Sequence, residues 1–217
     1  MELFYNPLSR SCQKVLIALY EKQANFFPRI INLHDPLERR RYAELYPLCS
    51  LPLLKTKDNW QLPDSSIIIE YVDQQIHAGT QLIPREPQTN LRTKMLDRLI
   101  DNQLYRTLYD MEKHQRLPEQ MQQQLLIKQH EKQLRLVLLE LENQLKQHHW
   151  LCGDGFTLAD CALIPALNSL PKEIQLMEFY ELSRYWQQAE LRGSWQLVEE
   201  EVEQAQAALH SGIQPPP

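Results

Sequence analysis

The stretch Ser50-Leu-Pro-Leu-Leu54 is short and apolar and predicts a strand, although its proline cannot donate a hydrogen bond to a neighbouring strand. Trp60-Gln-Leu62 predicts a second strand, and Pro63-Asp64-Ser65 leads into an apolar run that predicts a helix. An X-Pro bond at the start of a strand, beside a hairpin, favours a cis peptide. A helix that begins at Asp64 and Ser65 offers free backbone N–H groups and a positive dipole end. The two features together predict a receptor for an extended, peptide-like molecule with an anionic end.

The sequence on either side of this stretch completes an α/β domain. Residues 2–5 and 26–31 predict two more strands, and residues 11–21, 37–46 and 64–76 predict helices. The resulting order, βαβ–α–ββα, indicates a thioredoxin-like domain with a small mixed sheet. The βαβ portion predicts a right-handed crossover.

A second, all-helical domain follows. Gly79-Thr80 and Pro84-Arg-Glu-Pro87 interrupt the alternating pattern, and the chain beyond residue 90 has almost no strand signal. Residues 125–145 carry leucines on one stripe, which is typical of an amphipathic bundle helix. We therefore predict a thioredoxin-like domain at residues 1–80, a helical domain at 88–210 and a disordered tail at 211–217.

Composition narrows the classes of function. The 217 residues carry a formal net charge of −5, and 43% of them are hydrophobic, as in a globular protein without the basic surface of a nucleic-acid binder. No apolar run approaches the ~20 residues of a membrane helix, and the first residues do not resemble a signal peptide. The four cysteines form no CxxC pair and no zinc-type spacing with histidine. We expect no metal, no membrane contact and a cytoplasmic location.

The loop from Tyr5 to Cys12 joins the first predicted strand to the first helix, where α/β sheets commonly bind ligands. Ser9 and Cys12 stand in an S-x-x-C relation, which is a thioredoxin-type C-x-x-C pair with its attacking thiol replaced by a hydroxyl. Serine cannot form a redox thiolate, but its hydroxyl can donate a hydrogen bond to a bound thiolate. Such a bond lowers the pKa of the bound thiol and keeps the nucleophile populated near neutral pH.

The stretch Gly153-Asp-Gly-Phe-Thr157-Leu-Ala-Asp160 opens a helix of the second domain. Thr157 as N-cap and Asp160 at the third helical position are typical of a capping box. The residues that follow, 161–167, are apolar and predict a helix buried at the centre of the bundle.

These motifs, taken in order, resemble those of the cytosolic glutathione transferases. Residues 8–19 resemble the first helix of the serine- and cysteine-type classes, and Leu51-Pro52 resembles the family's Val-Pro. Residues 63–72 resemble its Glu-Ser-x-x-Ile-x-x-Tyr-Leu segment, and residues 153–160 its capping motif. The resemblance implies an N-terminal thioredoxin-like domain, a C-terminal helical bundle and a homodimer.

The resemblance also implies roles for individual residues. Ser9 would stabilise the thiolate of glutathione, Leu51 would pair its backbone with the cysteinyl amides, and Pro52 would orient that edge. Ser65 would hold the γ-glutamyl carboxylate, and Asp64 its ammonium group. The implied activity is attack of activated glutathione on an electrophilic small molecule, a detoxification reaction.

The electrophile is expected to bind to residues 100–115, with Leu104, Tyr105, Leu108 and Tyr109 as candidates. Its chemical identity does not follow from the sequence.

Two departures from the family pattern leave alternatives open. Tyr5 lies where the tyrosine-type classes keep their thiolate-stabilising phenol, so Tyr5 and Ser9 both qualify for that role. Ser50 replaces a long basic or amide side chain that would contact the glycyl end of glutathione; Lys55, Lys57 and Arg39 are possible substitutes. The sequence at 160–167 also resembles the stringent starvation protein A group, non-catalytic proteins of the same fold that bind RNA polymerase.

Overall fold

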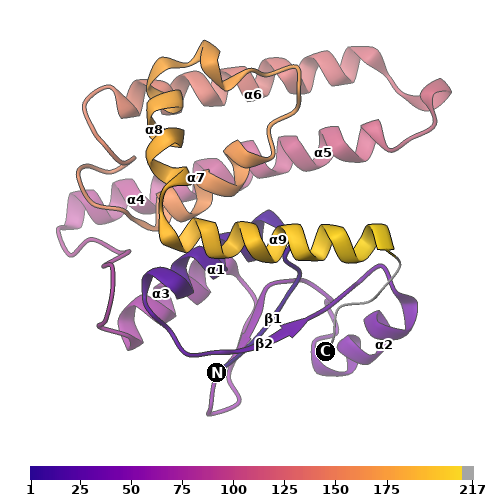
Figure 1. Ribbon diagram of the computed structural model, residues 1–217, viewed down its shortest axis with the longest axis vertical. Coiled ribbons are helices and arrows are strands. Elements are labelled where there is room, and N and C mark those ends of the chain that lie inside the picture. The colour runs from indigo at the N-terminus through magenta and orange to yellow at the C-terminus, as the bar shows by residue number, and fades with distance from the viewer. Residues whose placement is uncertain (212–217) are drawn as a thin grey trace. The chain divides into compact units, whose positions relative to one another are not determined.

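The computed structural model describes residues 1–211, which divide into two compact units (Figure 1). The first unit comprises Met1–Leu82 together with the chain from Gly193 onward, and the second comprises Ile83–Arg192. Within residues 1–211, no helix combines the length and the apolar character needed to cross a membrane. The predicted tail, 211–217, lies outside the described residues except for Ser211.

The first unit contains a mixed four-stranded sheet with the strand order β2-β1-β3-β4. Its strands are β1 (Glu2–Tyr5), β2 (Phe27–Ile30), β3 (Leu53–Lys55) and β4 (Gln61–Leu62). The β1–β2 pair is parallel, and the other two pairs are antiparallel, with Leu3 opposite Leu54. This sheet confirms the predicted thioredoxin-like topology.

Three helices of the first unit follow the sheet strands in sequence: α1 (Arg10–Glu21), α2 (Pro36–Leu45) and α3 (Ser65–Gln75). Every residue of α1 from Cys12 to Leu19 is buried, because α1 packs against both α3 and α9 (Gly193–Ser211). The helix α9 lies along α1 (Figure 1).

The position of α9 differs from the sequence-based division, which assigned residues up to 210 to the helical domain. The structure places α9 in the first unit, where Trp195 and Val198 are fully buried. The apolar stripe of α9 has a partner in α1, whose side chains are buried on more than one face. The spacing of apolar residues indicates that a helix has an apolar face, but it does not indicate which element packs against that face.

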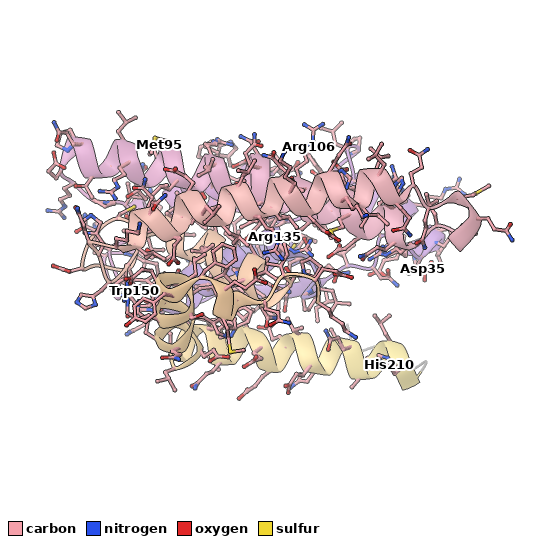
Figure 2. All side chains as sticks on the ribbon, turned by 90° about the horizontal axis from the view of Figure 1, so that it is seen from above. Asp35, Met95, Arg106, Arg135, Trp150 and His210 are labelled. Atoms are coloured by element: carbon pink, nitrogen blue, oxygen red, sulfur yellow. The ribbon has the colours of Figure 1, made fainter. Side chains whose placement is uncertain are left out.

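The second unit is helical. Its main elements are α4 (Pro87–Leu99), the π-helical segment η1 (Ile100–Tyr105), α5 (Arg106–Gln115), α6 (Gln124–Leu145), α7 (Leu158–Asn168) and α8 (Tyr180–Glu190), with short 3-10 turns η2 (Glu119–Met121) and η3 (Leu176–Glu178). All ten residues of α7 from Leu158 to Leu167 are buried, which confirms its predicted central position. Arg135 of α6, labelled in Figure 2, donates to Glu178 at 2.5 Å.

The capping box of α7 is present as predicted. The Asp160 carboxylate accepts hydrogen bonds from the Thr157 N–H at 2.8 Å, the Thr157 hydroxyl at 2.9 Å and the Leu151 N–H at 3.0 Å. The Tyr185 hydroxyl donates to it at 3.2 Å. Burial raises the pKa of Asp160 to about 6, although these four donors oppose the shift. One carboxylate therefore joins the start of α7 to the preceding loop and to α8.

Candidate functional site

In the first unit, three loops lie at the same end of the sheet strands. Because β1 and β3 are antiparallel, with Phe4 opposite Leu53, the loop that follows β1 adjoins the segment that precedes β3. Because β3 and β4 are also antiparallel, with Leu54 opposite Leu62, the end of β4 and the start of α3 lie at the same edge. The topology thus brings Ser9, Leu51-Pro52 and Asp64-Ser65 to one side of the sheet.

The segment before β3 presents unpaired backbone. The Leu51-Pro52 bond is cis, as the sequence predicted. The hydroxyl of Tyr42 donates to the Ser50 carbonyl at 3.0 Å and so fixes the residue before Leu51. Across residues 1–211, no hydrogen bond uses the backbone N–H or carbonyl of Leu51. Leu51 can therefore pair with the backbone of an extended peptide.

The start of α3 presents unused donors beside this segment. Asp64 is the N-cap, and its carboxylate accepts from the Ile67 N–H at 3.0 Å. The Ser65 side chain is 8% exposed, and neither its hydroxyl nor its N–H has a partner within the described chain. Both groups lie at the positive end of the helix dipole. An anionic group is the natural ligand for such a position.

Ser9 is the N-cap residue of α1, but its side chain does not cap the helix. Its backbone carbonyl accepts from the N–H groups of Cys12 and Gln13, both at 2.9 Å. The Gln13 side chain in turn donates to the Pro7 carbonyl at 2.7 Å. These backbone bonds and the Gln13 side chain fix the loop. None of them uses the half-buried Ser9 hydroxyl.

The Cys12 thiol is fully buried and receives a side-chain hydrogen bond from Ser9 and one from the Asn6 N–H at 3.4 Å. Burial raises the pKa of this thiol to about 11 despite these two bonds. A thiol with so high a pKa is protonated near neutral pH and is a poor nucleophile. Cys12 thus acts as a packing residue in this site.

Tyr5 is committed to a different contact. Its hydroxyl donates to Glu201 Oε2 at 2.7 Å, and the Tyr20 hydroxyl donates to the other oxygen of the same carboxylate. Burial and the bond to Glu201 raise the pKa of Tyr5 far above its usual value. Glu201 could not be predicted as a partner of Tyr5, because it lies in α9, 196 positions away, and no local motif links the two residues.

Three of the four expected electrophile contacts are part of the packed interior. Leu104 and Leu108 are buried, and Tyr105 donates its hydroxyl to the Ala162 carbonyl at 2.7 Å. These side chains pack within the helical unit. Tyr109 is 59% exposed and remains the one candidate of this set for contact with an electrophile.

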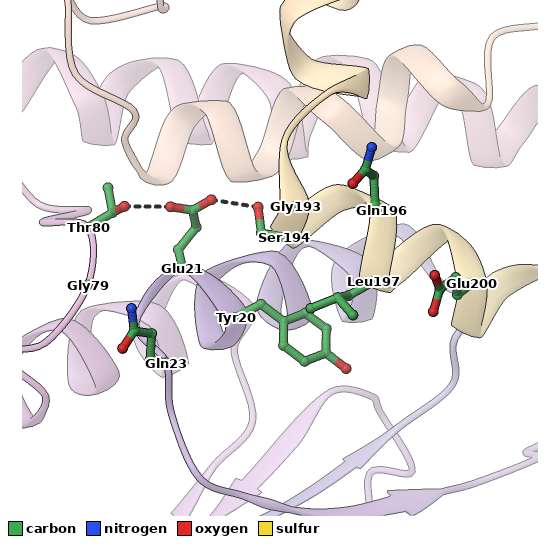
Figure 3. Close-up of a pocket in the computed structure, with 10 residues that line it drawn as sticks. All are labelled: Tyr20, Glu21, Gln23, Gly79, Thr80, Gly193, Ser194, Gln196, Leu197 and Glu200. Atoms are coloured by element: carbon green, nitrogen blue, oxygen red, sulfur yellow. Dashed lines mark hydrogen bonds between the residues drawn. The ribbon is translucent and has the colours of Figure 1, made fainter.

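A cavity of about 620 Å³ lies at the other end of α1 from Ser9 (Figure 3). Its central group is Glu21, which accepts hydrogen bonds from the hydroxyls of Thr80 and Ser194, both at 2.5 Å. Gly79 lets the chain approach α1 here, since it has a φ of +68° and a Cβ would lie 2.0 Å from the Glu21 carbonyl oxygen. The polar groups of this cavity hold α9 and the 79–80 segment on α1.

Comparison with known proteins agrees with this architecture. Residues 3–79 match the family described as glutathione S-transferase, N-terminal domain, and residues 107–190 match its C-terminal domain. The chain is 28% identical over 171 residues to a stringent starvation protein A homolog of Coxiella burnetii, which covers 79% of this chain and 76% of that protein.

Solved structures with the same fold include a glutathione S-transferase of Methylobacillus flagellatus with glutathione bound. It is 24% identical, covers 91% of this chain and 98% of that one, and has a TM-score of 0.82. Glutathione S-transferase 1-6 of Anopheles dirus is 18% identical and covers 98% of this chain and 100% of that one, with a TM-score of 0.85. The chain belongs to the glutathione transferase family and is related to stringent starvation protein A.

Proposed function

We propose that this protein binds glutathione in its first unit and activates the thiol for attack on an electrophilic small molecule. The observation that carries the proposal is the pair of unused backbone and hydroxyl groups at Leu51 and Ser65, on one edge of one sheet. An extended tripeptide with a carboxylate at one end matches both features.

In the proposed complex, the backbone of Leu51 pairs with the cysteinyl residue of glutathione. Ser65 receives the γ-glutamyl carboxylate through its hydroxyl and N–H, and Asp64 receives the γ-glutamyl ammonium group. The glycyl end has weaker support, because the exposed Ser50 offers no long side chain. Arg39 and Lys57, which are also exposed, are the candidates for that end.

We assign stabilisation of the glutathione thiolate to the hydroxyl of Ser9. Of the two candidate hydroxyls, that of Tyr5 is engaged with the Glu201 carboxylate, whereas that of Ser9 lies on the loop beside Leu51 and Ser65 and donates to the Cys12 thiol, which is only a weak acceptor. A hydroxyl that donates to a thiolate lowers the thiol pKa, since the bond favours the charged form. Thiolate stabilisation and the fixed position of the bound tripeptide then supply the rate enhancement.

We further propose a cytoplasmic homodimer that acts in detoxification, with Tyr109 as a contact for the electrophile. The exposed ring of Tyr109 offers an apolar surface with a hydroxyl at its edge.

A second candidate function is a non-catalytic interaction protein that acts with RNA polymerase, as the resemblance to stringent starvation protein A implies. The similarity to the Coxiella burnetii homolog favours it. The short Ser50 side chain also favours it, because a site that has lost its glycyl contact need not bind glutathione.

Retention on glutathione resin, followed by a conjugation assay with an activated chloronitroarene, separates the two functions. The transferase proposal predicts specific elution by free glutathione and a conjugation rate that saturates with glutathione. A protein that passes through the resin and shows no conjugation overturns the proposal and leaves the interaction protein as the better account.

A further inference from the structure

The Ser9 hydroxyl donates to the Cys12 thiol instead of capping α1. Ser9 is the N-cap residue of α1, and Cys12 is the third residue of that helix. A serine at this position commonly accepts a hydrogen bond from the backbone N–H of the second or third helical residue, but the Ser9 side chain makes no such bond. It donates to the sulfur of Cys12. The Ser9 oxygen therefore lies beside Cys12 and accepts no cap bond from the helix.

The Cys12 thiol has a fixed position beside this hydroxyl. Its side chain is fully buried, and the backbone N–H of Asn6 also donates to its sulfur, at 3.4 Å. Asn6 is itself fixed, because its side chain donates to the Ile31 carbonyl at 3.2 Å and accepts from the Leu8 N–H at 2.9 Å. Two donors from the loop before α1 thus converge on one sulfur atom of the helix.

The thiol is protonated near neutral pH. Burial raises the pKa of Cys12 to about 11, so its sulfur carries a hydrogen atom under these conditions. A neutral thiol is only a weak hydrogen-bond acceptor and a weak donor. The Ser9 hydroxyl is therefore readily transferred from Cys12 to a charged acceptor, because a charge-assisted hydrogen bond is about twice as strong as a neutral one.

A glutathione thiolate at the ligand end of the sheet is such a charged acceptor. When the Ser9 hydroxyl turns about its Cβ–Oγ bond toward the thiolate, a lone pair of the Ser9 oxygen becomes available to Cys12. The S–H of Cys12 can then donate to that oxygen, while the Asn6 N–H still donates to the sulfur. Hydrogen bonds in such a chain polarise and strengthen one another.

We propose that Cys12, in addition to packing, is a positioning residue for Ser9. In the free protein its sulfur accepts the Ser9 hydroxyl and holds it in place. In the glutathione complex its S–H donates to the Ser9 oxygen and makes the hydroxyl a stronger donor to the thiolate. No proton leaves Cys12, and Cys12 does not touch the ligand. This inference rests on the proposed function and deepens it, since it adds a second residue to the stabilisation of the thiolate.

Ultraviolet titration of the thiol in saturating glutathione tests the role with two variants of nearly equal volume. Cys12→Ala removes the acceptor and the donor, whereas Cys12→Ser keeps both. Because the two substitutions leave similar space in the core, a difference between them reports the hydrogen bonds and not the packing. Cys161→Ala is the control, since Cys161 is also fully buried but lies in α7 of the second unit.

The pKa of the bound thiol should rise by about 0.5–1 unit in Cys12→Ala, stay within about 0.3 unit of the unsubstituted protein in Cys12→Ser, and remain unchanged in Cys161→Ala. The titration reports only the folded protein with its ligand bound, so a loss of stability does not obscure the result. If Cys12→Ala fails to fold, Cys12→Val fills the space without a donor and should show the same rise.

A bound-thiol pKa in Cys12→Ala that is equal to or below that in Cys12→Ser overturns the role of Cys12 and leaves the glutathione site intact. If the unsubstituted protein binds no glutathione, or leaves its thiol pKa at the free value, the proposed function itself is overturned, and the role of Cys12 with it.

Discussion

The hydroxyl of Tyr5, at the end of β1, donates to the carboxylate of Glu201 in α9 at 2.7 Å. Tyr20 donates to the same carboxylate, so one side chain of α9 engages two tyrosines of the first unit. A tyrosine held in this way does not have its hydroxyl free for a bound thiolate. Because of this contact, we assign stabilisation of the glutathione thiolate to the Ser9 hydroxyl and not to that of Tyr5.

Tyr5→Phe should therefore lower stability and spare activity. The substitution leaves the Glu201 carboxylate with one donor fewer, at a cost of about 1–2 kcal/mol in the free energy of unfolding. Urea denaturation measures this cost, and a glutathione conjugation assay should give a rate within about twofold of the unsubstituted protein. Loss of conjugation without loss of stability would show that Tyr5 contacts the thiol after all.

Asp64→Asn should separate ligand binding from helix capping. Asparagine caps a helix about as well as aspartate, so the bond to the Ile67 N–H persists and the free energy of unfolding changes by less than about 1 kcal/mol. The charge that receives the γ-glutamyl ammonium is lost, and the affinity for S-hexylglutathione should fall roughly tenfold. Calorimetry and urea denaturation of the same preparation give the two numbers. Unchanged affinity would leave Asp64 as a cap only.

Gly79→Ala should destabilise the first unit, because a Cβ at this position would lie 2.0 Å from the Glu21 carbonyl oxygen and the residue has a φ of +68°. We expect a loss of about 1–3 kcal/mol in the free energy of unfolding. Gly155→Ala is the matched control, since a Cβ there meets nothing within 4 Å, and its effect should stay below about 0.5 kcal/mol. Equal effects of the two substitutions would show that position 79, beside Glu21, does not require a glycine.

The raised pKa of Asp160 predicts how stability depends on pH. Burial raises this pKa from 3.8 to about 6, so between these values the folded state binds more protons than the unfolded state. The contribution of Asp160 is therefore fully present below pH 3.8 and declines as the pH rises through 6, by roughly 3 kcal/mol at most.

Asp160→Asn is neutral at every pH and provides the reference for this effect. As the pH falls from 7 to 5, the unsubstituted protein should gain unfolding free energy relative to Asp160→Asn. Urea denaturation at several pH values gives the difference. A constant difference, or the opposite slope, would contradict the raised pKa.

The parts of the fold set by local chemistry were predictable from the sequence. The cis bond before Pro52 and the capping box of Thr157 and Asp160 each depend on residues a few positions apart, and both are present. The mixed sheet followed from the order of strand and helix signals. The first two features are local, and the sheet follows from the order of its elements, so the sequence was sufficient to predict all three.

Features set by distant partners were not predictable. The helix α9 packs on α1 in the first unit, and Glu201 engages Tyr5 across 196 positions. Leu104 and Tyr105 of the π-helical segment η1 are buried, although the sequence predicted that they contact an electrophile. An apolar pattern alone does not separate a pocket wall from a packed core.

The ultraviolet titration of the thiol in bound glutathione tests the central claim, which is that Ser9 stabilises the thiolate. We expect the pKa of the bound thiol to lie about 1–2 units below that of free glutathione in the unsubstituted protein and in Tyr5→Phe. In Ser9→Ala it should return to the free value, with a loss below about 1 kcal/mol in the free energy of unfolding, because the Ser9 side chain makes no cap bond and its bond to Cys12 uses a weak acceptor. A lowered pKa that survives Ser9→Ala and is abolished by Tyr5→Phe would contradict the account.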